Sequence, residues 1–150
     1  MSRLLFLCTG NLYRGRFAEE YFRAVAGDLG LPWTVTSRGL AERLDSRQAG
    51  QTLSPVAEDW LGRFGIPAAA AGRAPRAVTL ADLLGHQHVI ALDRAEHEPL
   101  FSQRFPGLSL PVEFWHIGDA QVEPPALALP RLVDAIDSLV DRLQRPSRTA

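Results

Sequence analysis

Short apolar runs alternate along this chain with longer segments in which apolar residues recur every three or four positions. Residues 4–8 form a continuous apolar run that ends at polar and glycine residues, which is typical of a strand covered on both faces of a parallel sheet. Residues 33–36 are rich in β-branched and aromatic side chains, and residues 88–93 form another buried run. Together with a short candidate at residues 111–117, the pattern predicts four strands.

The segments between these runs have the periodicity of amphipathic helices. The spacing of three and four is clear over residues 16–27 and again over residues 129–143. A helix at residues 55–64 is preceded by a capping serine, begins with a proline and ends at a glycine. Shorter helices are predicted at residues 79–84 and 94–101.

The remaining segments are expected to be loops. Residues 37–53 are polar, residues 68–77 are rich in alanine, and residues 119–125 are bounded by proline, in a position that suits a lid or wall. Strands separated by helices imply an α/β sandwich with a mainly parallel sheet. Ligands of such folds gather at the carboxyl ends of the strands.

The length and composition of the chain predict one domain over residues 1–150. The chain is 46% hydrophobic and 22% charged, as expected for a globular protein. Sixteen basic and 17 acidic side chains give a formal net charge of -1, so no overall field favours nucleic acid or a membrane as a partner. No apolar stretch approaches the roughly 20 residues that span a bilayer. The single cysteine excludes an internal disulfide, and a cytoplasmic location is expected.

The segment from Cys8 to Arg14 carries the clearest chemical signal, because five residues separate a cysteine at a strand end from an arginine at a helix start. Gly10 and Asn11 can adopt left-handed dihedrals, so this short loop can turn successive backbone N–H groups inward around an anion. The positive end of the following helix adds to the attraction. Seven residues are expected to form the phosphate-binding loop: Thr9, Gly10, Asn11, Leu12, Tyr13, Arg14 and Gly15.

Cys8 and Arg14 are the candidate catalytic pair of this loop. Arg14 can bind two anion oxygens through its planar guanidinium, and Cys8 lies where a nucleophile is needed. A helix N-terminus and an arginine lower the pKa of a nearby thiol below the roughly 8.5 of a free cysteine. We therefore expect Cys8 to attack phosphorus as a thiolate and to form a phosphocysteine.

The stretch Leu-Phe-Leu-Cys-Thr-Gly-Asn at residues 5–11, continued through Arg14 and followed by Phe-Ala-Glu at residues 17–19, resembles the low-molecular-weight protein tyrosine phosphatase family. Residues 36–39, 53–66 and 89–93 are similar to later landmarks of that family and occur in the same order. The resemblance covers most of the chain, and its specific part is the loop from Cys8 to Arg14.

This resemblance implies a phosphotyrosine phosphatase I-like fold, a three-layer α/β sandwich with a four-stranded, mainly parallel sheet. It also implies hydrolysis of a phosphorylated protein or a small phosphomonoester, with inorganic phosphate or another oxyanion as a ligand and with no cofactor or metal. Asp119 matches the general acid of the family, and Glu123 is the alternative. Asn11 and Ser37 match residues that support the loop through hydrogen bonds.

The histidines are consistent with the absence of a metal. Their spacing along the chain does not indicate a shared metal site, and strand-edge or surface positions are expected for all of them: His86, His88, His97 and His116.

Departures from the family pattern leave the activity open. Gly15 replaces a serine whose hydroxyl supports the loop and assists the thiolate, Arg16 replaces a proline, and Ala120 replaces the proline of the Asp-Pro pair. A hydrogen bond to a charged group contributes about 1.5–3 kcal/mol, so reduced activity is expected. One alternative is a catalytically weakened module that binds phosphate or a phosphopeptide. Tyr13 replaces a second cysteine with which some members protect the nucleophile. Another alternative is an arsenate reductase that uses an external thiol, because related reductases need additional cysteines and this chain has none.

Overall fold

The computed structural model describes residues 2–42, 44, 53–67 and 73–145. Its strands are β1 (Ser2–Cys8), β2 (Trp33–Gly39), β3 (His88–Ala91) and β4 (Glu113–Phe114). They form one sheet in the order β2-β1-β3-β4, and all neighbouring pairs are parallel. The α/β class and the four-stranded parallel sheet predicted from the sequence are confirmed.

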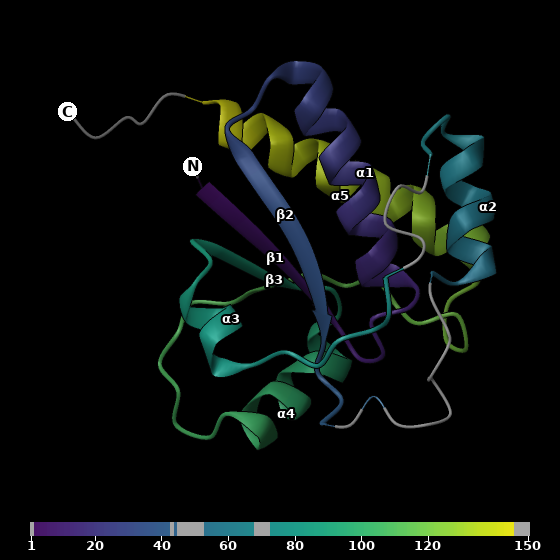
Figure 1. Cartoon of the computed structure of the whole chain (residues 1–150). Coiled ribbons are helices and arrows are strands. Elements are labelled where there is room, and N and C mark those ends of the chain that lie inside the picture. The colour runs from purple at the N-terminus through teal and green to yellow at the C-terminus, as the bar shows by residue number, and fades with distance from the viewer. Residues whose placement is uncertain (1, 43, 45–52, 68–72, 146–150) are drawn as a thin grey trace.

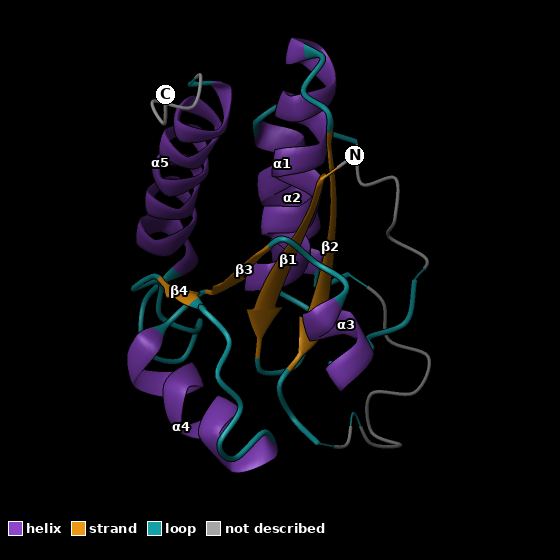
Figure 2. Ribbon diagram, turned by 90° about the vertical axis from the view of Figure 1, so that its left-hand side faces the viewer, coloured by secondary structure: helices purple, strands orange, loops and turns teal. Residues whose placement is uncertain are grey.

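The helices cover both faces of this sheet and make three layers (Figures 1 and 2). On one side lie α1 (Arg14–Leu29), α2 (Pro55–Arg63) and α5 (Pro125–Gln144), and on the other lie α3 (Leu80–Leu84) and α4 (Arg94–Arg104). No helix in the described part of the chain is both long enough and apolar enough to cross a membrane.

Alternation along β1 divides the core into two parts, because successive side chains of a strand point to opposite faces. Leu4, Phe6 and Cys8 belong to the core that includes α1, α2 and α5. Leu5 and Leu7 belong to the core beneath α3 and α4. Cys8 is therefore the last inward residue of a strand whose neighbours are fully buried, and its side chain faces the layer that contains α1.

The ends of β2, β3 and β4 differ from those predicted. β2 continues to Gly39, so Ser37 lies within a strand and not in a loop, because this segment keeps pairing with β1 up to the Cys8–Gly39 pair. β3 ends at Ala91, two residues early. The predicted strand at residues 111–117 is reduced to β4, an edge strand that pairs only with β3.

The segment after β4 still follows β3. The Trp115 N–H donates to the Ala91 carbonyl at 2.9 Å, and the Ile117 N–H donates to the Leu92 carbonyl at 2.8 Å. These hydrogen bonds bring the chain that leads to Asp119 to the carboxyl end of the sheet, where the loop after β1 also lies. The predicted end of the last helix at Pro146 falls outside the described residues, and α5 ends at Gln144.

Candidate active site

The loop between β1 and α1 has Cys8 at one end and Arg14 at the other, as the spacing predicts. Asn11 has a φ of 57°, which is the left-handed dihedral expected at this turn. The backbone N–H groups of Asn11 and Gly15 lie near the Cys8 sulfur, where they favour its thiolate. The loop therefore curves around the sulfur, with a strand end and a helix N-terminus meeting at that point.

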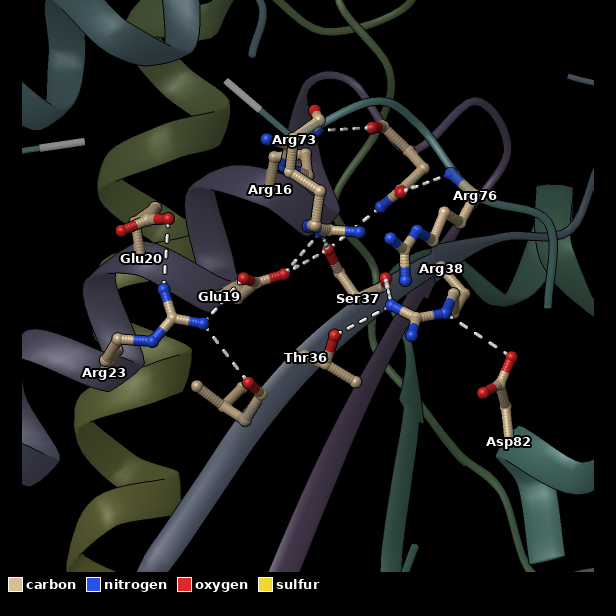
Figure 3. A network of polar contacts seen from close by, with 12 residues as sticks. Arg16, Glu19, Glu20, Arg23, Thr36, Ser37, Arg38, Arg73, Arg76 and Asp82 are labelled. Carbon is tan, nitrogen blue, oxygen red and sulfur yellow. Dashed lines mark hydrogen bonds and ion pairs between the residues drawn. The ribbon is translucent and has the colours of Figure 1, made fainter. Parts of the chain in front are cut away.

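Asn11 and Ser37 are brought together as predicted. The Asn11 side chain donates through Nδ2 to Ser37 Oγ at 2.9 Å and accepts through Oδ1 from the Arg76 N–H at 2.9 Å. Ser37 Oγ in turn donates to Glu19 Oε1 at 2.7 Å, and Arg73 Nη2 donates to the same carboxylate oxygen at 2.8 Å (Figure 3). The position of Asn11 thus depends on a buried polar network that reaches α1, β2 and residues 73–76.

Arg14 is buried, and two contacts hold its guanidinium. Nη1 donates to the Ile117 carbonyl at 2.9 Å, and Nη2 donates to Glu96 Oε2 at 2.7 Å. Burial opposes the charged form of Arg14, but the hydrogen bond and charge of Glu96 raise the pKa of this guanidinium above its ordinary value. The other N–H groups of Arg14 remain for an anion.

Glu96, at the start of α4, accepts hydrogen bonds from three groups of the site. Arg14, the Thr9 hydroxyl and the His97 ring all contact its Oε2 atom, the ring at 3.2 Å. The Asp93 N–H donates to His97 Nδ1 at 3.0 Å, which leaves the ring proton on Nε2, facing Glu96 and Thr9. The hydrogen bond from His97, followed by those from Arg14 and Thr9, lowers the pKa of the Glu96 carboxyl far below its ordinary value.

The ionisation of Cys8 is not the one expected from the sequence. Burial raises the pKa of the thiol above its ordinary value and outweighs the lowering by Arg14 and by the N–H groups of Gly15 and Asn11. Glu96 raises it further. The expected depression of the thiol pKa is therefore wrong, because Cys8 is 3% exposed and the nearby arginine shares its charge with a carboxylate.

Gly15 leaves room that the sulfur of Cys8 uses. A Cβ atom at position 15 would lie 2.9 Å from Cys8 Sγ and 3.5 Å from the Cβ of Ser37. Because carbon and sulfur do not approach so closely without contact strain, a side chain here would force the sulfur to move. The absence of a side chain at this position therefore goes together with close packing of the Cys8 sulfur against the helix.

Asp119 and Glu123 have different surroundings. Asp119 Oδ1 lies 3.9 Å from Arg14 Nη2, and its side chain is 41% exposed. Glu123 accepts the Gly118 N–H at 3.1 Å and pairs with Arg131. Asp119 therefore has a carboxylate available beside Arg14, whereas both oxygens of Glu123 have partners that hold the loop.

Tyr13 closes the loop on the side of these two carboxylates. Its hydroxyl oxygen is buried and has no hydrogen-bond partner among the described residues. Burial raises the pKa of Tyr13 to about 12, with Arg14 opposing this shift and Asp119 and Glu123 adding to it. Leu12 contributes its carbonyl, which accepts the Ser54 N–H at 2.9 Å and ties the loop to the start of α2.

Comparison with known proteins decides the family. The family model described as low molecular weight phosphotyrosine protein phosphatase matches residues 3–108. This chain belongs to that family. Its members are cysteine-dependent phosphatases that act on phosphorylated substrates. None of the curated proteins matches the sequence closely enough to add a more specific relative.

Solved structures of this family superpose along the whole chain. The low molecular weight protein tyrosine phosphatase from T. tengcongensis has a TM-score of 0.72 at 26% identity, with 95% of this chain and 99% of that chain covered. The YwlE arginine phosphatase from Geobacillus stearothermophilus has a TM-score of 0.73 at 25% identity, with 96% and 94% covered. YfkJ from Bacillus subtilis, at 22% identity with 96% and 95% covered, has a TM-score of 0.77 and supports the fold.

Several residues near the loop were not predicted from the sequence. Glu96 and His97 come from α4, and Glu19 and Arg73 lie behind Ser37. His97 is fully buried and His86 nearly so, which corrects the expectation that both lie at strand edges or on the surface. Spacing along the chain gave no signal for Glu96, His97 or Arg73, because these residues are distant from the loop in the sequence.

Proposed function

We propose that this phosphatase family member hydrolyses phosphomonoesters through a phosphocysteine on Cys8. The observation that carries the proposal is the arrangement around the sulfur: two backbone N–H groups lie near it and favour its thiolate, and Arg14 is held at the end of the same loop. Such a loop can bind the three non-bridging oxygens of a phosphoryl group while the sulfur faces phosphorus.

In the first step, the Cys8 thiolate attacks phosphorus and the bond from phosphorus to the leaving oxygen breaks. The leaving oxygen takes a proton from the Asp119 carboxyl, which lies beside Arg14 and is open to solvent. Arg14 and the loop N–H groups hold the charge that develops on the phosphoryl oxygens. The step yields a phosphocysteine and the free alcohol or phenol.

In the second step, water attacks phosphorus of the phosphocysteine. The Asp119 carboxylate takes a proton from this water, and the sulfur–phosphorus bond breaks to return the Cys8 thiolate and inorganic phosphate. One carboxyl group thus acts first as an acid and then as a base. No step requires an electron acceptor or a second thiol.

Turnover of small aryl phosphates tests this proposal. Cys8→Ser is expected to lower kcat by at least about 10³-fold, because the nucleophile is removed. Asp119→Asn is expected to lower kcat by about 10²-fold or more for phenyl phosphate and by less for p-nitrophenyl phosphate, whose leaving group needs no proton. Glu123→Gln is the matched control and should show no dependence on the leaving group. Full activity of Cys8→Ser would contradict the mechanism.

A second candidate function is phosphate binding without turnover. It is supported by the raised pKa of the Cys8 thiol and by the lack of a hydroxyl at Gly15, which both disfavour the thiolate. This candidate predicts that phosphate protects Cys8 from alkylation while no aryl phosphate is hydrolysed at any pH between 5 and 9. Hydrolysis that requires Cys8 would exclude it.

A further inference from the structure

Behind the anion loop lies a buried arginine that the proposed reaction does not use. Arg16 is fully buried in the first turn of α1, although arginine is among the residue types that are seldom buried without polar partners. Its Nη1 atom donates to the Arg73 carbonyl at 2.9 Å and lies 3.4 Å from the Asn11 carbonyl. Figure 3 shows its side chain next to that of Arg73, above Ser37 and Glu19.

The contact from Arg16 adds to the contacts that hold Asn11. Its side-chain amide contacts Ser37 and the Arg76 N–H, its own N–H lies near the Cys8 sulfur, and its carbonyl contacts Arg16. The side chain and the carbonyl of this left-handed residue are therefore both held in place. Because the peptide bond is planar and trans, a carbonyl that points to Arg16 turns the N–H of Leu12 to the opposite side, away from Arg16.

The position of the charge matters as well. The charged groups that act on the loop are Arg14 and Arg16 from α1, Glu96 from α4, and Asp119 and Glu123 from the segment after β4. Arg14 shares its charge with Glu96 at 2.7 Å, so it offsets the burial of the sulfur only in part. Burial lowers the pKa of Arg16, and the charges of Glu19, Glu20 and Cys8 oppose that shift.

We infer that Arg16 is a positioning residue of the anion loop: its guanidinium holds the Asn11 carbonyl from behind and supplies a second positive charge that stabilises the Cys8 thiolate. It takes on part of the support that the missing side chain at Gly15 cannot give. This inference rests on the proposed function in that it explains how the loop stays competent, but the state of the thiol can be measured without turnover.

The test is the pH dependence of Cys8 alkylation by iodoacetamide in Arg16→Met. The variant is expected to raise the thiol pKa by roughly 0.5–1 unit and to slow alkylation at pH 7 by about 3–10-fold. Protection by inorganic phosphate should weaken by a similar factor. The matched control is Arg23→Met, which removes the same charge from the same helix. It also removes the ion pair of Arg23 Nη2 with Glu19 Oε2 at 2.7 Å, but the Arg23 side chain has no hydrogen bond or ion pair with the loop among the described residues.

Two further variants keep the inference open to contradiction. Arg16→Lys retains the charge and should keep the thiol pKa within about 0.3 unit of the unmodified protein. Arg16→Gln is neutral but retains a donor, so it serves as the test if Arg16→Met does not fold. An unchanged thiol pKa and unchanged phosphate protection in folded Arg16→Met or Arg16→Gln would overturn the inference. If the unmodified protein does not hydrolyse aryl phosphates, only the proposed hydrolysis is contradicted, because the thiol pKa and the phosphate protection are measured without turnover.

Discussion

Glu96 reaches the anion loop from α4 and contacts the two loop residues Thr9 and Arg14. A carboxylate in this place has two opposite effects on an incoming phosphate. It holds the guanidinium of Arg14 in position, and it also adds a negative charge beside a site that must accept another anion. The second effect is the larger one in our account, because the Ile117 carbonyl also holds Arg14, at 2.9 Å.

Glu96→Gln tests this balance. Removal of the negative charge is expected to lower the thiol pKa of Cys8 by roughly 0.5–1 unit, since Glu96 raises it, and to tighten phosphate binding by about 3–10-fold. The pH dependence of Cys8 alkylation measures the thiol pKa, and protection from alkylation by phosphate measures the binding. Glu98→Gln, on the same helix but paired with Arg94, should change neither. Weaker phosphate binding in Glu96→Gln would mean that positioning of Arg14 is the dominant effect.

The residues predicted from the sequence are those whose relation is local. Cys8, Asn11 and Arg14 are linked by spacing within one short loop, so their joint placement follows from the strand before and the helix after it. Glu96 contacts Arg14 of this loop across a separation of 82 residues in the sequence. Arg73 donates to Ser37, which contacts the loop in turn. Spacing along one chain carries no information on such contacts, since they depend on how helices pack on the sheet.

The start of α1 is an element in which glycine is required by packing. Gly15→Ala would place a Cβ atom 2.9 Å from Cys8 Sγ, whereas Gly27, in the last turns of the same helix, has no atom within 4 Å of such a Cβ. We expect Gly15→Ala to lower the free energy of unfolding by about 1–3 kcal/mol and to slow alkylation of Cys8. Gly27→Ala should raise the free energy of unfolding by about 0.5–1 kcal/mol, because alanine favours a helix.

Urea unfolding of the two variants measures this contrast. The two substitutions add the same methyl group to the same helix, so a difference between them reports the surroundings alone. Equal effects on stability would show that the sulfur can move away from position 15 without loss of unfolding free energy. The close packing of Cys8 against α1 would then not be required for the fold.

Element types could be predicted from periodicity better than element ends. The buried run before Cys8 is sufficient to predict a strand, and the apolar spacing of α5 is sufficient to predict a helix. β4 is shorter than its apolar run suggests because only two of its residues pair with β3, and β2 is longer because it pairs with β1 beyond the β-branched residues. Pairing of strands, which the sequence does not state, sets these ends.

At the scale of the whole molecule, Glu113 joins three elements at the edge of the sheet. Its carboxylate accepts from Arg142 of α5 at 2.8 Å, from His88 of β3 at 2.9 Å and from the Trp115 indole at 2.6 Å. Burial raises the pKa of Glu113, but these three hydrogen bonds outweigh it and lower the pKa from 4.5 to about 2. The edge strand is thereby tied to the layer that contains α1 and α5.

Glu113 should contribute to stability in a defined pH range. Because its folded pKa is below its unfolded one, the contribution is complete above pH 4.5 and is lost as pH falls towards 2. With its partial exposure discounted, we expect Glu113→Gln to cost about 1–2 kcal/mol at pH 7 and much less at pH 2.5. Urea unfolding at both pH values measures this, with the exposed Asp59→Asn as the control. An equal cost at both pH values would contradict it.

The measurement that tests the central claim most directly is capture of the phosphoenzyme. The protein is mixed with an aryl phosphate, quenched within the first turnovers and digested, and the peptide that contains Cys8 is examined by mass spectrometry. We predict one phosphoryl group on Cys8, with more of it in Asp119→Asn, where the attack of water on the phosphocysteine lacks its base. Hydrolysis of the aryl phosphate without any phosphoryl group on Cys8 would contradict the account.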